Sequence, residues 1–476
     1  MRTGDHVPAG AAASRPAAPG LREAPAVGEL FLGVFRRDLA SFYPQAQLQP
    51  IPSGSGGFNP AAGPDFRLTE HPDDGVVIDL FGVRHRLDSR GAGRFSPQDV
   101  RMIRAIGAVL SLRYQHLFQM THSSRLELYR GGSEDHYVAA FVEPWAYTPT
   151  ARRPSRIAGT VHTLRTAALS TYENRRVSTG ALLLGEGDRD GRDRPTPVDA
   201  LPYGVELTAL KSIHRLCDGK RTLFLVDRDG RLVEVIDIAR WAGDDGDDGD
   251  RPDVPCARDY TPHARATGSG GHLCLVLSPN QEIKIFAGGS QQFAFAHGRW
   301  RILDPAAKYA VWASAVTEPR LARVLFQTAL DLVECRQGGL FVVVDDPAAA
   351  LGRLIAPHDL LADEAPDGPP VALNLGDPLA KRALHYLVRG RSITEIDPSV
   401  LEALAGLDGA VVVDRSGRLL AFGAILRHDA SASFGPAAEG ARTTAGLIAS
   451  RFGPVLKVSE DGIVSCFLGG ARVWDL

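Results

Sequence analysis

The chain carries one series of short sequence segments twice, in the same order. Along the chain, the pairs are RTAALSTYENR with FQTALDLVECR, TGALLLG with GGLFVVVDD, LCDGKRTLFLVDRDGRL with LDGAVVVDRSGRL, HARATG with GARTTA, and LSPNQEIKIFAGG with VSEDGIVSCFLGG. Each short match alone is a common helix or strand–turn–strand pattern, whereas the serial order is not. We therefore interpret residues 160–304 and 318–476 as tandem copies of one structural unit.

Within each copy, segments of helical periodicity alternate with apolar runs of strand length, which is typical of mixed α/β sheets packed by helices. A smaller α/β region is predicted at 28–150, with LFLGVFRRDLASFY and SPQDVRMIRAIGAVLSLRYQHLF as helices, GVVIDLFGVRHRL as a hairpin and 123–147 as two further strands. Residues 1–27, rich in Ala, Pro and Gly, are predicted to form a disordered tail. The fold class is thus α/β, with two tandem mixed-sheet domains after a small α/β region to which no motif gives a role.

Composition and charge argue against several classes of protein. A net formal charge of −3 gives no basic field for nucleic acid. The five cysteines are dispersed without a Cys-x-x-Cys pair, which argues against a disulfide framework and against structural zinc. No apolar run approaches the ~18 residues of a membrane span, and residues 1–27 lack the apolar core of a signal peptide. We expect a soluble, cytoplasmic protein that binds neither membranes nor nucleic acid.

The first chemically suggestive segment is Asp408-Gly409-Ala410, which follows a Leu-rich helical stretch and enters an apolar strand. Gly and Ala at such a turn let a planar group or a backbone approach closely. A carboxylate there can hold a divalent metal ion or accept a proton from a ribose hydroxyl. The simpler alternative is a helix C-terminal turn capped by Asp and Gly.

A second segment, 440–445, is predicted to open a helix. A helix start presents backbone N–H groups and a partial positive charge, which together favour phosphate. Arg442 adds a bidentate donor, and the hydroxyls of Thr443 and Thr444 can donate hydrogen bonds or cap the helix. The alternative is a plain Thr-capped helix. In the third segment, 458–462, Ser459 and Glu460 are either ligand-facing residues or parts of an ordinary hairpin turn.

In order and spacing, these three segments resemble the core of the diadenylate cyclase (DAC) domain family, whose members join two ATP molecules into cyclic di-AMP. The resemblance implies that Asp408 and Glu460 lie near the sugar or a Mg²⁺ or Mn²⁺ ion. It also implies that Arg442 and the helix start at 443–445 hold phosphates.

The chain departs from the family in its second motif, Gly-x-Arg-His-Arg, because Thr443 and Thr444 stand where the family has His and the second Arg. This replacement removes one fixed positive charge and one potential ligand. Losing a transition-state contact of that kind typically costs ~3 kcal/mol or more. The resemblance therefore implies that nucleotide binding survives the replacement better than turnover.

The first copy departs further from the family pattern. Its counterparts of the site residues are Asp218, Gly219, Arg265 and Thr267. Lys220 follows Gly219 in place of Ala, and Ser278-Pro279-Asn280, the counterpart of the third segment, has no carboxylate. Both copies keep an Arg with a Thr two residues later, which fits a phosphate cradle better than a reaction centre.

Three functions stay open. The first is a nucleotide sensor that binds ATP or a cyclic dinucleotide, catalyses slowly or not at all, and signals through a separate effector protein. The second is an active diadenylate cyclase that uses Mg²⁺ or Mn²⁺, and the third is an interaction module that binds no nucleotide. Cyclases of this family appose two domains face to face, so the tandem copies suggest an internal pseudo-dimer or a homo-oligomer.

Overall fold

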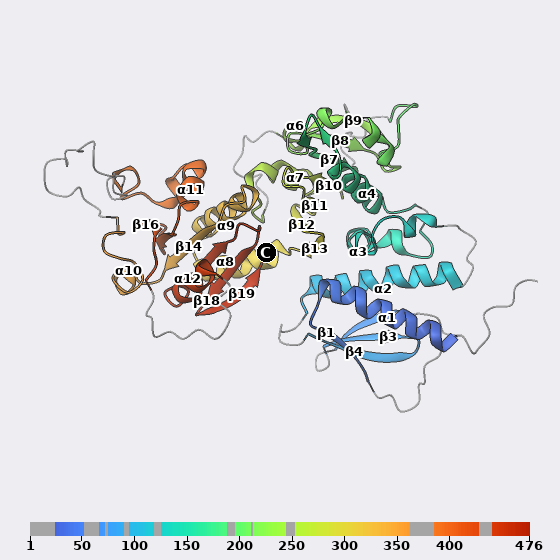
Figure 1. The fold of residues 1–476 in the computed structure, drawn as a ribbon, viewed down its shortest axis with the longest axis horizontal. Helices are drawn as coiled ribbons and strands as arrows, with labels where there is room; N and C mark the ends of the chain where they lie inside the picture. The colour runs from blue at the N-terminus through green and yellow to red at the C-terminus, as the bar shows by residue number, and fades with distance from the viewer. Residues whose placement is uncertain are drawn as a thin grey trace, which may run out of the picture. The chain divides into compact units, whose positions relative to one another are not determined.

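The computed structural model describes residues 24–51, 66–71, 75–89, 95–118, 125–151, 153–187, 196–210, 213–243, 253–361, 385–427 and 440–476. The chain divides into two compact units, Met1–Ala158 and Gly159–Leu476. Both units combine helices with β-sheets, so the α/β fold class is confirmed (Figure 1). Among the helices of these described ranges, none has the length and apolar content that crossing a bilayer requires.

The N-terminal unit is built around a four-stranded antiparallel sheet of order β1-β4-β3-β2. Its main elements are α1 (Ala24–Phe42), β1 (Ala46–Pro50), β2 (Arg67–His71), β3 (Gly75–Leu80), β4 (Val83–Ser89) and α2 (Pro97–Phe118). The predicted hairpin forms β3 and β4, and the two predicted helices form α1 and α2. Helix α1 begins inside the predicted tail 1–27, whose first 23 residues lie outside the described part.

The prediction of two strands between 123 and 147 is wrong. The described part of this segment, residues 125–147, forms the short 3-10 helices η2 (Leu126–Tyr129) and η3 (Pro144–Tyr147) on either side of α3 (Ser133–Val142). The Asp135 carboxylate accepts a hydrogen bond from the Gly132 N–H at 3.2 Å and so caps the start of α3. The pair Gly131-Gly132 therefore precedes a helix and does not form a hairpin turn. Apolar side chains at Tyr137, Val138 and Phe141 are buried on one helical face.

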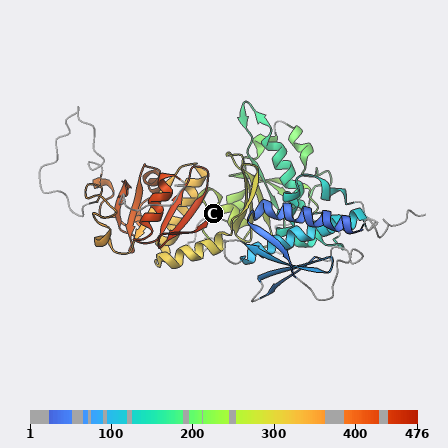
Figure 2. The same cartoon turned by 60° about the horizontal axis from the view of Figure 1, so that its bottom comes forward.

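The C-terminal unit contains one large mixed sheet for each repeat (Figures 1 and 2). The first has the order β13-β12-β11-β10-β7-β8-β9, and the second has the order β16-β15-β14-β17-β18-β19. The strands of the first sheet are β7 (Thr179–Leu183), β8 (Thr222–Val226), β9 (Leu232–Asp237), β10 (Leu273–Leu277), β11 (Ile283–Ala287), β12 (Ser290–Ala296) and β13 (Arg299–Ile302). Those of the second are β14 (Gly339–Val344), β15 (Ala410–Asp414), β16 (Leu419–Ala424), β17 (Val455–Val458), β18 (Val464–Leu468) and β19 (Ala471–Asp475).

The two sheets share one topology. In each, the first strand pairs in parallel with the second (β7 with β8, β14 with β15) and antiparallel with the fourth (β7 with β10, β14 with β17). The matched hairpins also agree in detail, because the Ser278 N–H bonds the Glu282 carbonyl at 2.8 Å and the Ser459 N–H bonds the Ile463 carbonyl at 2.9 Å. Strand β13 is an addition to the first repeat. The repeated segments thus predict the shared topology correctly.

One matched pair of segments differs in structure. Helix α4 (Arg156–Ala168) ends early, and a small hairpin of β5 (Thr171–Tyr172) and β6 (Arg175–Arg176) follows it. In the second repeat, α9 (Pro319–Glu334) stays helical through the matched residues. The hairpin turns at Glu173 and Asn174, whose φ angles are 50° and 62°, the left-handed values of a two-residue hairpin turn.

Helices cover both faces of the second sheet. On one face, α9 buries Phe326 and Leu332 with Phe341 and other side chains of the sheet. On the other face, α12 (Ala441–Ala449) packs Ala449 against a separate core cluster of the same strands. In the first repeat, the short helix α7 (Thr261–Ala266) takes the place of α12.

Helix α9 also contacts the first repeat, where Leu330 packs against a cluster that contains Tyr260 and Phe286. This cluster lies on the face of the first sheet that carries α7. The α7 face of the first repeat therefore meets the side of the second repeat that lies opposite α12. The predicted face-to-face pseudo-dimer is not the arrangement found. The boundary between the repeats at 304–318, an interval spanned by α8 (Pro305–Val316), stays a prediction.

Candidate functional site

The second repeat has an open pocket of about 1220 Å³ on the face of its sheet that carries α12. Strand pairing places four lining residues in one row across β14, β17, β18 and β19: Leu340, Lys457, Ser465 and Asp475. The turn after α11 (Pro398–Ala405), the start of α12 and the hairpin between β17 and β18 supply most of the other polar lining residues. We call this cavity the α12 pocket.

The structure brings together three side chains that the sequence singles out. Arg442, at the start of α12, lies between two carboxylates from different loops. Its Nη1 is 3.2 Å from Glu460 Oε1, and its Nη2 is 3.5 Å from Asp408 Oδ1. The Asp408 side chain is 99% exposed and that of Glu460 is 70% exposed, so both carboxylates are open to a ligand. Ion pairs this exposed contribute little to stability.

Gly338 makes room for this arrangement. A Cβ atom at position 338 would lie 2.2 Å from Arg442 Nη1, closer than any real contact. The missing side chain therefore lets the guanidinium lie between Asp408 and Glu460. Sequence reasoning missed this role, and the available signal was the Gly-Gly pair in front of β14.

Two predicted site residues support the backbone of the site. Gly409 has a φ of 109°, and a Cβ there would lie 2.4 Å from the carbonyl carbon of Gly423 on the neighbouring strand. Ala410 is buried in the core beneath the sheet surface. Ser459 lines the pocket, but its hydroxyl already donates to the Ile463 carbonyl at 3.0 Å across the hairpin.

The start of α12 forms one wall of the pocket. Gly440, with a φ of 90°, precedes the helix, and its carbonyl accepts a hydrogen bond from the Thr443 N–H at 3.1 Å. Thr443 is buried, whereas Thr444 is half-buried, and both line the pocket. Residues 428–439, which precede this wall in the chain, lie outside the described part.

Sequence reasoning missed the two cations on the strands that line the pocket. Lys457 on β17 and Arg472 on β19 line the α12 pocket, together with Asp461 and Asp475. Arg472 Nη1 is 3.7 Å from Asp475 Oδ2. Lys457 and Arg472 belong to no motif, and the register between strands places them on the same face as Arg442.

The lining residues carry four carboxylates and three cations, so the pocket has a negative formal charge. Asp408 and Glu460 both reach the same guanidinium, so their oxygens converge on one region. Mg²⁺ is usually bound through one or two carboxylates together with phosphate oxygens, and this pair fits an ion that arrives with a phosphate ligand. Within the described ranges, no three His, Cys, Asp or Glu side chains form a metal cluster without such a ligand.

The equivalent region of the first repeat is filled by α9. Strand register places Lys284, Gln291 and Ala294 at the positions of Ser465, Arg472 and Asp475. These three residues line a cavity of only about 50 Å³, and Leu330, Val333 and Glu334 of α9 line it from the other side. The first repeat therefore has a helix where the second has an open pocket.

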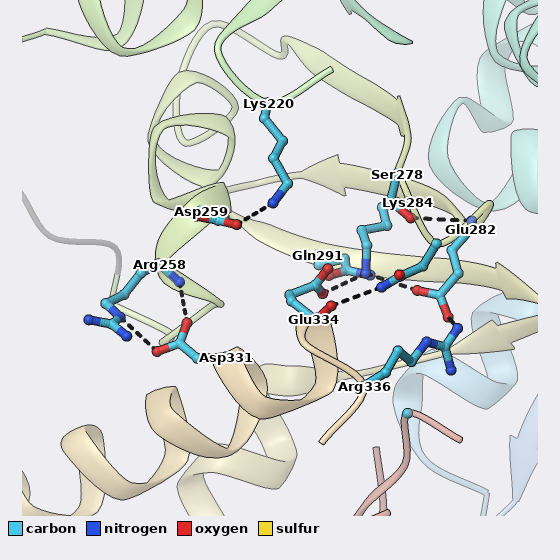
Figure 3. Close-up of polar contacts among 12 residues, drawn as sticks. Lys220, Arg258, Asp259, Ser278, Glu282, Lys284, Gln291, Asp331, Glu334 and Arg336 are labelled. Carbon is cyan, nitrogen blue, oxygen red and sulfur yellow. Dashed lines mark hydrogen bonds and ion pairs between the residues drawn. The ribbon is translucent and has the colours of Figure 1, made fainter. Parts of the chain in front are cut away.

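A buried ionic cluster holds this contact together (Figure 3). Lys284 Nζ is 2.6 Å from Glu334 Oε1 and 3.2 Å from Glu282 Oε2, and only 3% of the lysine side chain is exposed. Arg336 Nη2 lies 2.6 Å from the other oxygen of Glu282. Burial acts to lower the pKa of Lys284, but Glu334 and Glu282 outweigh it and raise that pKa. The lysine is therefore a fixed cation.

A second ion pair lies further along α9. The Asp331 carboxylate accepts a hydrogen bond from the Arg258 backbone N–H at 2.6 Å and another from its Nε at 2.9 Å. Burial raises the pKa of Asp331 to about 6, although the donors of Arg258 oppose this. Arg258 also pairs with Glu402 of α11.

The predicted residues of the first copy serve local structure. Asp218 accepts hydrogen bonds from the N–H groups of the next turn, of which that of Arg221 is at 2.7 Å, and these bonds lower its pKa although burial acts to raise it. Arg265 donates to the Gly243 carbonyl at 3.2 Å. The buried Thr267 hydroxyl donates to the His263 carbonyl at 3.0 Å. The Gly219 carbonyl bonds the His263 ring, which occupies buried space beside it.

Comparisons with known proteins give only weak structural likenesses. No family model and no curated protein matches the sequence. A hypothetical membrane spanning protein from Bacillus cereus matches with 20% identity and a TM-score of 0.24, over 35% of this chain and 69% of that chain. A double mutant of DacA from Staphylococcus aureus matches with 17% identity and a TM-score of 0.22, over 34% of this chain and 89% of that chain. Neither match assigns a function to this chain.

Proposed function

We propose that the second repeat binds a nucleotide, either ATP or a cyclic dinucleotide, in the α12 pocket and acts as a catalytically impaired sensor. The observation that carries this proposal is the convergence of Asp408, Arg442 and Glu460 at the start of a helix. These are the side chains through which the DAC-like segments would hold a nucleotide. We also propose that the sensor signals through a separate effector protein.

The size and lining of the pocket support a ligand of this class. Its volume of about 1220 Å³ is above the ~300–1,000 Å³ of ordinary small-molecule sites. Ile425, Leu426 and Ile463 provide apolar surface for a base, and Ile425 is 68% exposed. Phosphates would lie at the start of α12 beside Arg442, where the N–H groups and the helix dipole favour anions.

A divalent ion would fit beside Asp408 and Glu460 and would neutralise phosphate charge there. The residues of the chain have separate tasks: Arg442 donates to a phosphate once ligand or ion draws the carboxylates away, and Thr444 offers a hydroxyl. Neither threonine carries the charge of the His and Arg in the family motif. A transition-state contact of that kind is worth ~3 kcal/mol or more, so we expect binding without appreciable turnover.

The structure also bears on stoichiometry. Because α9 fills the equivalent region of the first repeat, the described residues form this pocket in the second repeat alone, and we expect one ligand per chain. The runner-up function is an active diadenylate cyclase, which the exposed carboxylates of Asp408 and Glu460 favour. A reaction between two ATP molecules would then require the α12 pockets of two chains to meet.

The test is calorimetry of the full chain with ATP and with cyclic di-AMP, each with Mn²⁺, followed by chromatography of the mixtures. We expect binding with a stoichiometry near one, unchanged nucleotide, and loss of binding in Arg442→Ala. Arg299→Ala, an exposed arginine on the edge strand β13, is the matched control and should bind normally. Formation of cyclic di-AMP that is lost in Asp408→Asn would establish the cyclase. Absence of binding to either nucleotide would leave the interaction module.

A further inference from the structure

Among the described residues, one side-chain cation of the α12 pocket has no partner. Lys457 lies on β17 between Leu340 and Ser465, and its neighbours Leu456 and Val458 point to the opposite face, into the core under α9. Within the described residues, the Lys457 side chain makes no hydrogen bond and no ion pair, whereas Arg442 and Arg472 each lie beside a carboxylate.

The fold does not require a lysine at this position. The first repeat has the same topology, and its equivalent residue is Val276, which pairs with Gly180 and Lys284 as Lys457 pairs with Leu340 and Ser465. Val276 is fully buried in the core beside α7. An apolar residue thus completes this row of the sheet, and an unpaired ammonium group in a half-buried position is unfavourable without a counter-charge.

The two arginines of the pocket already lie beside carboxylates. Arg442 is already neutralised by Asp408 and Glu460, and Arg472 by Asp475. Lys457 is the lining cation whose charge remains available among the described residues. It also lies on the same side of the sheet as the start of α12, where N–H groups and the helix dipole favour the same anionic ligand.

We propose that Lys457 binds a phosphate group of the nucleotide and supplies the positive charge that Thr444 cannot. This inference rests on the proposed function and assigns a phosphate-binding residue that lies outside every DAC-like segment. A lysine ammonium is a point charge on a flexible stem, so it follows a phosphate without demanding bidentate geometry. Its contribution therefore depends on the phosphates of the ligand and not on the base or sugar.

The experiment compares Lys457→Met, which keeps the length of the side chain, and Lys457→Val, which installs the residue of the first repeat. Titration calorimetry of the full chain with ATP, ADP and adenosine, each with Mn²⁺, gives the affinities. Both variants should bind ATP about 10- to 100-fold more weakly, the range of one hydrogen bond between charged groups. Adenosine affinity should be unchanged, and Lys457→Arg should restore most of the ATP affinity.

Lys220→Met is the matched control, because Lys220 pairs with Asp259 on the surface of the first repeat. It should leave all affinities unchanged. If Lys457→Met and Lys457→Val bind ATP as tightly as the wild-type protein, this inference is overturned and the proposed function stands. Equal loss of ATP and adenosine binding would also overturn it, because Lys457 would then act on the shape of the pocket. Wild-type protein that binds neither ATP nor cyclic di-AMP would refute both proposals.

Discussion

The ionic cluster under α9 gives the sharpest test of how the two repeats are joined. Lys284→Met keeps the bulk of the side chain and removes its charge. Glu282 would still have Arg336, but Glu334 would lose its cationic partner while its side chain stays about nine-tenths buried. Removing one partner of a buried ion pair typically destabilises a protein by about 3–5 kcal/mol. Against a total stability of about 5–15 kcal/mol, this is a large fraction.

Urea denaturation followed by tryptophan fluorescence measures the effect, since Trp300, Trp312 and Trp474 all lie in the C-terminal unit. Hydrogen exchange of peptides from β11 and α9 then locates the weakened contact. The double variant Lys284→Met with Glu334→Leu removes the stranded charge as well, and apolar replacement of a whole buried pair is often close to neutral. We therefore expect the double variant to regain most of the lost stability.

The exposed pair of Lys220 and Asp259 is the matched control, with side chains 37% and 55% exposed. Lys220→Met should change the free energy of unfolding by less than about 1 kcal/mol. The proposed role of the buried ionic cluster would be refuted if Lys284→Met changed the free energy of unfolding as little as Lys220→Met. It would also be refuted if the effects of Lys284→Met and Glu334→Leu were simply additive in the double variant.

Two further predictions concern single positions. Gly338→Ala should displace the Arg442 guanidinium and weaken ATP binding about 10-fold or more. It should have little effect on stability, because the clash is with the end of a flexible side chain. Calorimetry with a parallel thermal melt measures both, and unchanged affinity would show that Arg442 does not hold the ligand. Asp331, whose pKa burial raises from 3.8 to about 6, binds a proton more tightly in the folded state, so stability should fall by up to about 3 kcal/mol as pH rises from about 4 to 6. Urea titrations across this window should show that Asp331→Asn removes this part of the pH dependence, and an unchanged slope would contradict it.

The sequence is informative where local pattern determines structure. The order of repeated segments predicts two sheets of one topology, because each segment is a strand or turn whose neighbours are set by the chain. Asp408, Arg442 and Glu460 were predicted because each lies at the end of an element, where side chains of separate loops meet. The strands predicted at 123–147 failed because a Gly-Gly pair fits a helix start as well as a hairpin turn, and the capping bond of Asp135 decides between them.

The sequence is less informative where separate elements meet. Lys457 lies in an apolar strand with no motif, and only pairing with β14 and β18 brings it under the start of α12. The double role of α9 depends on Leu330, Asp331 and Glu334, which contact residues of the first repeat while the helix packs on its own sheet. The signal available was Leu330 together with the acidic residues Asp331 and Glu334. It does not say which surface covers them.

The position of one lysine explains why two copies of the same topology differ in what they offer a ligand. In the first repeat the lysine is on β11 and meets the carboxylate of Glu334, so a helix of the neighbouring repeat satisfies its charge. In the second repeat the lysine is one strand away, on β17, and faces an open pocket. Because α9 belongs to the core of the second repeat, the first repeat is held by the same helix that supports the sheet under the pocket. A ligand in the α12 pocket would therefore be separated by a single layer of strands from the helix that joins the repeats.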